Sequence, residues 1–194
     1  MNDHQLGFRA EETFIASQCV RFAVVWDSWR KGRLLPTRAD VDLTSIKDLM
    51  PQMAVVDVES DSVAMIRLIG TDFHPHFGKE MTGVNFIELA PPVDRPLRGY
   101  RQMSMSRHPC ASVSRIRQEG EEGKITITEI AAFPVAATSG DKPPQIYACT
   151  HMLQQDFIPA ESENQGDLKV PIAAEFRFLD IGAGVPPENP ADQI

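Results

Sequence analysis

The residues with the clearest capacity for metal or haem chemistry are His74 and His76, which are separated by one proline. Imidazole nitrogens are common ligands of transition metals and of haem iron. On a helix, however, residues two apart do not face each other, so the two rings cannot hold one ion together. Pro75 suits the first position of a helix, which makes His74 a helix cap or a surface residue. We therefore predict no metal site here.

A second pair that could do chemistry is His108 and Cys110, a base and a nucleophile two residues apart. A nucleophilic cysteine needs a base within hydrogen-bond reach and a third group that orients it. Pro109 fixes the backbone between them, and no orienting partner is evident in the sequence. We predict that Cys110 is a buried strand residue. His108 is expected to end a helix, where an imidazolium interacts favourably with the helix dipole.

Glu129 is the third candidate, because it places a carboxylate in a segment with the pattern of a strand. A buried carboxylate would need a cation to offset its desolvation, and the candidates are Arg67, Arg115 and Arg117. We expect Glu129 to be solvated or paired with an arginine rather than catalytic. Since no set of residues combines a nucleophile with an oriented base, the sequence predicts a protein that is not an enzyme.

The composition is that of an ordinary globular protein, with 42% hydrophobic and 24% charged residues in a chain of 194. The formal net charge of −8 argues against nucleic acid or an anionic membrane as the main partner. No apolar run approaches the ~18 residues of a membrane span, and the N-terminal residues lack the features of a signal peptide. Cys19, Cys110 and Cys149 are odd in number and isolated, which is typical of reduced, partly buried thiols. We expect a cytoplasmic protein.

Several elements must position these residues, and the first is a helix expected from about Glu12 to Lys31. Its apolar residues are spaced by 4, 3, 4 and 3, which is an a/d seam of two heptads. These dimer-interface candidates are Ile15, Cys19, Phe22, Trp26 and Trp29. The seam can dock on the core of its own domain, or it can also form a homodimer interface. Two heptads are too few to decide between the two.

Alternating and β-branched segments predict five strands around a helical middle region. The strands are expected at residues 53–58, 63–69, 111–118, 124–135 and 146–153, and a longer helix at 93–107. This order predicts an antiparallel α+β sheet with its helices gathered on one face. Residues 176–181 add one more strand or lie across the domain. The predicted organisation is an N-terminal helical extension (1–50), a core (51–156) and a C-terminal extension (157–194) that ends in a disordered segment from Pro186.

Four short motifs in this order resemble those of a known family. The first two are the helical segment Trp26-Asp27-Ser28-Trp29 and the Pro36-Thr37-Arg38 segment. The third joins Arg67-Leu68-Ile69-Gly70-Thr71 to Gly78-Lys79-Glu80-Met81-Thr82-Gly83, and the fourth is Phe133-Pro134-Val135. Across residues 20–155 the chain resembles the PAS-fold family found as stand-alone proteins in alphaproteobacteria. The resemblance implies a five-stranded PAS-like sheet in a sensor or protein-interaction domain.

The resemblance also bears on cofactors. Some PAS domains bind haem through a histidine on the helix that His108 ends, but its terminal place beside Pro109 argues against that role. PAS domains that form a flavin photoadduct carry a cysteine in the segment corresponding to residues 75–82, and this chain has none there. We expect no cofactor.

A PAS-type sheet with its covering segments can enclose a pocket, and aromatic and methionine side chains suit small, mostly apolar ligands. The pocket candidates are Phe73, Phe77, Phe86, Leu89, Leu97, Tyr100 and Met103. The sequence does not distinguish a lined pocket from a filled core.

The leading interpretation is a non-catalytic sensory or signalling module that acts as a dimer and binds a small ligand or an unidentified signalling protein. The alternative is a protein-interaction adaptor with no small-molecule ligand. A less favoured alternative is a small-molecule enzyme in an α+β cone, which would need Glu129, His108 or Asp72 to face the cavity.

Overall fold

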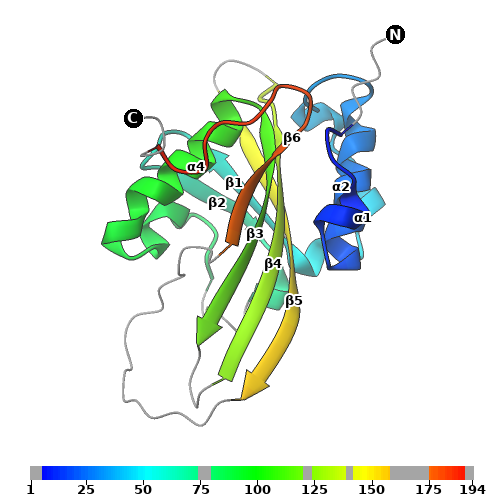
Figure 1. Cartoon of the computed structure of the whole chain (residues 1–194). Helices are drawn as coiled ribbons and strands as arrows, with labels where there is room; N and C mark the ends of the chain where they lie inside the picture. Colours follow the sequence, from blue (N-terminus) through cyan, green and yellow to red (C-terminus); the bar gives the residue numbers. More distant parts are fainter. Residues whose placement is uncertain (1–5, 74–79, 120–123, 139–141, 158–174, 191–194) are drawn as a thin grey trace.

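The central element is a six-stranded antiparallel sheet with strand order β2-β1-β5-β4-β3-β6 (Figure 1). The computed structural model describes residues 6–73, 80–119, 124–138, 142–157 and 175–190. The strands are β1 (Met53–Val58), β2 (Ala64–Ile69), β3 (Cys110–Glu119), β4 (Lys124–Val135), β5 (Gln145–Phe157) and β6 (Glu175–Asp180). The predicted α+β class is confirmed, and β6 adds a sixth strand by pairing with β3.

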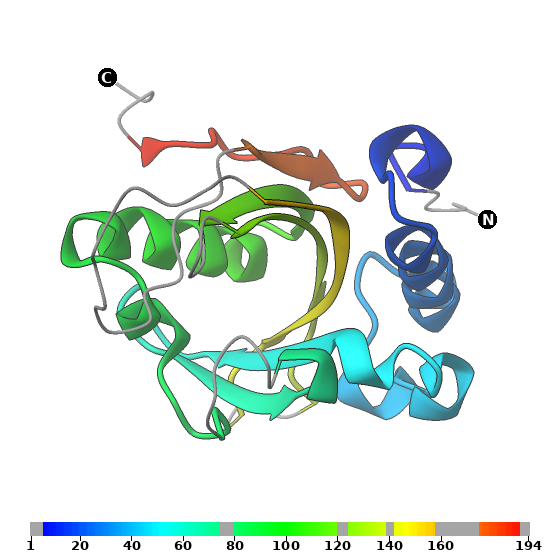
Figure 2. The ribbon, with the colours of Figure 1, turned by 90° about the horizontal axis from the view of Figure 1, so that it is seen from below.

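Helices cover both faces of the sheet, which curves around α4 (Figure 2). The N-terminal helices α1 (Ala10–Thr13) and α2 (Ser17–Arg30) lie on the outer side. The helix α4 (Arg95–Arg107) and the short 3-10 helix η5 (Phe86–Leu89) lie on the inner side. Among the described residues, no helix is long and apolar enough to cross a bilayer.

Two hydrophobic cores share the strands, because successive side chains of a strand point to opposite faces. On β4, Ala131 and Phe133 belong to the outer core with α2, whereas Ala132 belongs to the inner core with α4. The outer core is closely packed, with the Trp26 ring centroid 4.8 Å from that of Phe133. The inner core places the methionines of α4 over the other face.

Gly70 marks the point where the chain leaves β2 for the segments that cover the inner face. Its N–H donates to the carbonyl of Met53 at 2.7 Å, and a Cβ at this position would overlap the carbonyl oxygen of Pro51. Gly99 of α4 also allows a close approach between backbones, because a Cβ at this position would overlap the carbonyl oxygen of Asp61. The approach at Gly99 fixes where α4 sits against the β1–β2 hairpin, and the approach at Gly70 fixes the end of β2 against the segment before β1.

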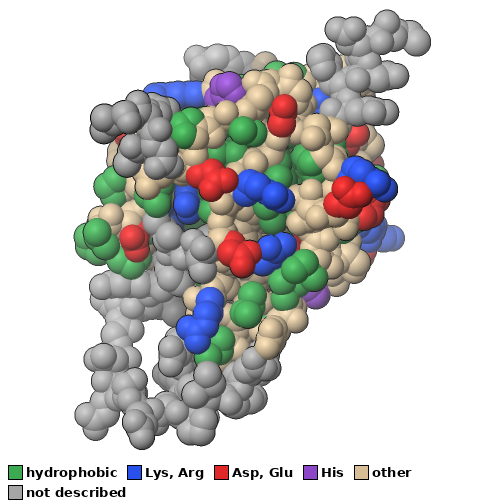
Figure 3. Space-filling model, viewed as in Figure 1, with side chains coloured by type: hydrophobic (Ala, Val, Ile, Leu, Met, Phe, Trp, Pro, Cys, Tyr) green, Lys and Arg blue, Asp and Glu red, His purple; other side chains and the backbone are tan. Residues whose placement is uncertain are grey.

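The C-terminal segment returns along α4. Tyr100 donates its hydroxyl to the carbonyl of Pro187 at 2.9 Å, so this part of the C-terminal segment contacts the helix. Residues 191–194, the rest of the expected disordered tail, lie outside the described residues. Acidic and basic side chains are interspersed on the face seen in Figure 3, and one such pair, Arg115 and Glu175, joins β3 to β6 at 2.7 Å.

Candidate functional site

A cavity of about 150 Å³ lies between the inner face of the sheet and the helices α4 and η5. Its floor is a row of small residues paired across four strands: Ala54 with Ala148, Ala148 with Ala132, and Ala132 with Ser112. All four line the cavity. Because small side chains stand side by side beneath α4, the inner core is not filled at this point.

A second row lies beside the floor and carries larger and more polar side chains. Thr150 pairs with Ile130, Ile130 with Ser114, and Ser114 with Phe176 of β6. Each of these side chains lines the cavity, so β6 contributes a wall to the site as well as an edge to the sheet.

The β2 wall depends on an irregularity in strand pairing. Val55 pairs with Leu68, but the next residue, Val56, pairs with Ile66, so that one residue of β2 is skipped. This shift lets Ile66 and Ile69, which are three residues apart, both line the cavity. The wall opposite the sheet comes from η5 and α4.

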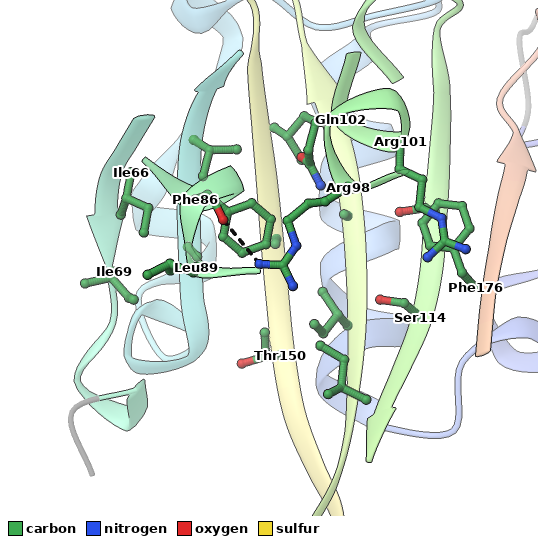
Figure 4. Close-up of a pocket in the computed structure, with 18 of the residues that line it drawn as sticks. Ile66, Ile69, Phe86, Leu89, Arg98, Arg101, Gln102, Ser114, Thr150 and Phe176 are labelled. Carbon is green, nitrogen blue, oxygen red and sulfur yellow. Dashed lines mark hydrogen bonds between the residues drawn. The ribbon is translucent and has the colours of Figure 1, made fainter. Parts of the chain in front are cut away.

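Arg98 of α4 brings a cation into this apolar space. The residue is 5% exposed, and Figure 4 shows its side chain extending from the helix into the pocket. Its Nη1 donates to the carbonyl of Phe86 at 3.2 Å, and its guanidinium carbon lies 4.7 Å from the centroid of the Phe86 ring. Burial lowers the pKa of Arg98 to about 10; Asp94 opposes this shift and Arg101 adds to it. The guanidinium therefore remains charged at neutral pH.

Arg101 stands three residues further along α4 at the β6 side of the cavity (Figure 4). Its guanidinium carbon lies 3.9 Å from the centroid of the Phe176 ring, a cation–π arrangement. Its Nε is buried and has no hydrogen-bond partner among the described residues. Burial lowers the pKa of Arg101, and the charge of Glu188 opposes that shift.

The predicted pocket residues divide into separate groups. Phe73, Phe86 and Leu89 line the cavity. Tyr100 and Met103 instead line a groove on the other side of α4, together with His108 and Pro186. Leu97 is half-buried and is in neither lining, and Phe77 lies outside the described residues. Whether these residues contact a ligand stays a prediction.

Sequence reasoning did not select Arg98, Arg101 or Gln102, the three polar residues of α4 that line the cavity. Arg101 and Gln102 follow Arg98 by three and four residues, a spacing that places all three on one face of the helix. That spacing was the available signal. It was missed because arginine on a helix is usually taken as a solvent-facing residue.

The helical seam proposed for a dimer interface is used inside the chain. Cys19, Phe22, Trp26 and Trp29 are buried against the outer face of the sheet, and Trp26 donates its indole N–H to the carbonyl of Pro134 at 3.0 Å. They are therefore not available to a second chain, because the apolar outer face of the sheet needs a cover. Only Ile15, at 67% exposure, remains on the surface among the five candidates.

Glu129 lies on this outer side, away from the cavity, and is 0% exposed. Its carboxylate accepts the N–H of Ala16 at 2.9 Å and those of Arg115 at 3.0 and 3.1 Å. It also accepts the Ile15 N–H. The expected arginine partner is therefore Arg115, and the carboxylate holds the start of α2 rather than a substrate.

The remaining candidates for chemistry are also away from the cavity. Cys110 is buried in β3 as predicted, and burial, with Asp180 second, raises its pKa to about 12. His108 and Asp72 are exposed, and neither lines the cavity. His74 and His76 lie outside the described residues, and within the described part of the chain no cluster of His, Cys, Asp or Glu has the arrangement of a metal site.

Comparison with known proteins gives the family. A model of the PAS domain family matches residues 16–148. Among solved structures, the chain is similar to a fungal LOV domain photoreceptor at 15% identity, over 60% of this chain and 94% of that chain, with a TM-score of 0.41. It is also similar to the PAS domain of a protein from Colwellia psychrerythraea at 13% identity, over 61% of this chain and 98% of that chain, with a TM-score of 0.37. No curated protein matches. Since the family model spans both strand groups and the helices between them, the chain belongs to the PAS domain family, whose members are sensory and signalling modules.

Proposed function

We propose that the protein is a non-catalytic sensory module that binds a small ligand in the cavity between the sheet and α4. The observation that carries the proposal is the unfilled inner core over the floor of Ala54, Ala132, Ala148 and Ser112, with the charged Arg98 reaching into it. Ligand sites in proteins are apolar concavities with a few placed polar groups, which is the composition of this wall.

The absence of catalysis is supported by the positions of the candidate acids and bases. An enzyme in this cavity would need a proton donor or acceptor within reach of a bound molecule. Glu129, His108 and Asp72 are not among the residues that line it. The arginines that do line it are charged at neutral pH and can orient or neutralise an anion, but they are poor proton-transfer groups.

The cavity on the inner face of the sheet is linked to α2 on the outer face through β3 and β4. Ser114 and Ile130 line the cavity, and their chain neighbours Arg115 and Glu129 point to the opposite face, where they hold the start of α2. A ligand that shifts β3 and β4 would also shift this attachment. We propose that occupancy is passed on by a displacement of α2.

We propose further that the protein is cytoplasmic and acts as a homodimer. Support for the dimer comes from Ile15 and Val24, two exposed apolar residues of the N-terminal helical layer, with Val24 at 53% exposure. Sedimentation should give a dimer for the wild type and for Val93→Asp, which changes an exposed valine outside the N-terminal helical layer, and a monomer for Val24→Asp. A wild type that sediments as a monomer at high micromolar concentration contradicts the dimer.

The ligand proposal is tested by native mass spectrometry of the protein purified from its own host. Ala148→Leu adds three carbons to the floor of the cavity and should abolish ligand retention. Ala148→Ser keeps the floor open and is the matched control, which should retain the ligand as the wild type does. A ligand that survives Ala148→Leu is not in this cavity. Repeated absence of any ligand from the wild type favours the adaptor, in which the protein binds only a partner chain.

A further inference from the structure

The ligand class can be inferred from the charges that face the cavity, and this step rests on the proposed function. Among the described lining residues, Arg98 and Arg101 are cationic and no side chain is acidic. Asp94 and Glu188 oppose the pKa shifts of these arginines but do not line the cavity, so the charges that face it are positive. A cavity with this balance favours a negatively charged occupant.

The two guanidinium groups have different surroundings. Arg98 donates to the Phe86 carbonyl and lies over the Phe86 ring, and these contacts orient it within the pocket (Figure 4). Arg101 lies on Phe176 with its Nε buried and without an acceptor among the described residues. Both come from the same face of α4, one turn apart. The charge of Arg101 disfavours that of Arg98, and an anion close to both would offset this repulsion.

The geometry of guanidinium suits oxyanions such as carboxylates and phosphates, and the apolar wall favours the carboxylate. Its planar, forked N–H donors match the two oxygens of a carboxylate in a bidentate arrangement. Gln102 and Ser114 also line the cavity and carry further polar groups for a carboxylate oxygen.

The size and lining of the cavity indicate the size and polarity of the rest of the ligand. A volume of about 150 Å³ is that of an engineered protein cavity that accommodates benzene. Apart from the polar residues on α4, β3 and β5, the wall consists of aliphatic and aromatic side chains. The body of the ligand should therefore be apolar and about the size of one ring.

We propose that the cavity binds a small amphipathic monocarboxylate, with the carboxylate at Arg98 and Arg101 and the apolar body over the floor of small residues. Benzoate is a suitable probe because it combines one carboxylate with one ring. Benzamide has nearly the same shape without the charge. Inorganic phosphate is an anion without the apolar body.

The test is a titration of the full chain with each probe, read from the methyl resonances of Ile66, Ile130 and Ile146, which line the cavity. Benzoate should shift these resonances, and benzamide should bind at least about tenfold more weakly, which is the effect of losing a charge-assisted hydrogen bond. Arg98→Met should weaken benzoate binding at least about tenfold and leave benzamide unchanged. Arg107→Met, an exposed arginine of the same helix, should leave benzoate binding within about twofold.

The outcomes separate this inference from the function on which it rests. If benzamide binds as tightly as benzoate, or if Arg98→Met leaves benzoate binding unchanged, the carboxylate inference is overturned and the ligand-binding function stands. If phosphate competes as strongly as benzoate, the apolar requirement is overturned. If neither ring compound shifts the three methyl resonances, the monocarboxylate inference fails, and the small-ligand function then depends on the native mass spectrometry alone. Should Arg98→Met not fold, as judged by circular dichroism, the comparison of benzoate with benzamide on the wild type decides the question alone.

Discussion

Glu129 and Ile15 are joined across 114 residues of sequence, because both carboxylate oxygens of Glu129 accept the Ile15 backbone N–H, at 3.0 and 3.1 Å. This contact attaches the chain just before α2 to the centre of the sheet. The N–H groups at a helix start have no partner within the helix, so a buried carboxylate is well suited to them.

Glu129→Ala should therefore destabilise the protein by about 2–4 kcal/mol, since it leaves buried N–H groups and Arg115 without their acceptor. The free energy of unfolding from urea titration measures this. Glu175→Ala removes the exposed partner of the same arginine, and should cost less than about 1 kcal/mol. Equal losses in the two variants would contradict a special role for Glu129.

Trp26→Ala should cost about 3–5 kcal/mol of folding stability, the usual effect of removing a large buried aromatic side chain. Because its partners are in the same chain, the loss should be independent of protein concentration. Val93→Ala, at an exposed valine outside the proposed dimer interface, should change stability by less than about 0.5 kcal/mol. A loss in Trp26→Ala that disappears at high protein concentration would instead indicate an intermolecular contact.

Gly99→Ala provides a test of how α4 is seated. In an exposed helix this change stabilises by about 1 kcal/mol through helix propensity. Here the new Cβ would overlap the carbonyl oxygen of Asp61, so we expect a loss of at least about 2 kcal/mol in thermal or chemical unfolding. A stabilised variant would show that α4 does not approach the hairpin this closely.

The pH dependence should show a contribution from Cys110. Burial raises its pKa from 9.0 to about 12, so the folded state favours the protonated thiol more than the unfolded state does. Its contribution to stability is complete below pH 9 and is lost as the pH rises from 9 towards 12. Unfolding free energies over this range should fall less steeply in Cys110→Ala than in the wild type. Identical slopes would mean that the thiol is not desolvated.

Local patterns predicted the elements of the fold well. The alternation and β-branched content predicted the bounds of β1 to β4 and the start of β5 to within one residue, whereas β5 runs past its expected end at residue 153 to Phe157. The spacing of Trp26 and Trp29 gave the correct buried face of α2. The sequence does not predict which surface the seam packs against, because a heptad pattern indicates that a face is apolar but not what covers it.

The candidate site was harder to predict, because it depends on pairing between distant strands. Ala54, Ala132 and Ala148 are unremarkable in sequence, and only their register across β1, β5 and β4 brings them together as a floor. Likewise, nothing in the sequence distinguishes Arg98 from an exposed helical arginine, and it is the position of α4 against the sheet that buries it. Strand register and helix docking are non-local properties, so a single sequence carries little direct signal for them.

The division of each central strand between two cores limits how this sheet can change by insertion. One extra residue in the middle of β4 would turn Glu129 towards the cavity and Ile130 towards α2, exchanging a buried carboxylate and an apolar side chain between incompatible surroundings. Length changes in this strand should therefore be tolerated in pairs of residues or at its turns. The pairings of β1 with β2 and of β5 with β4 each skip one residue, and the second irregularity lies between Ile127 and Thr128, before the segment of β4 that is shared by the two cores.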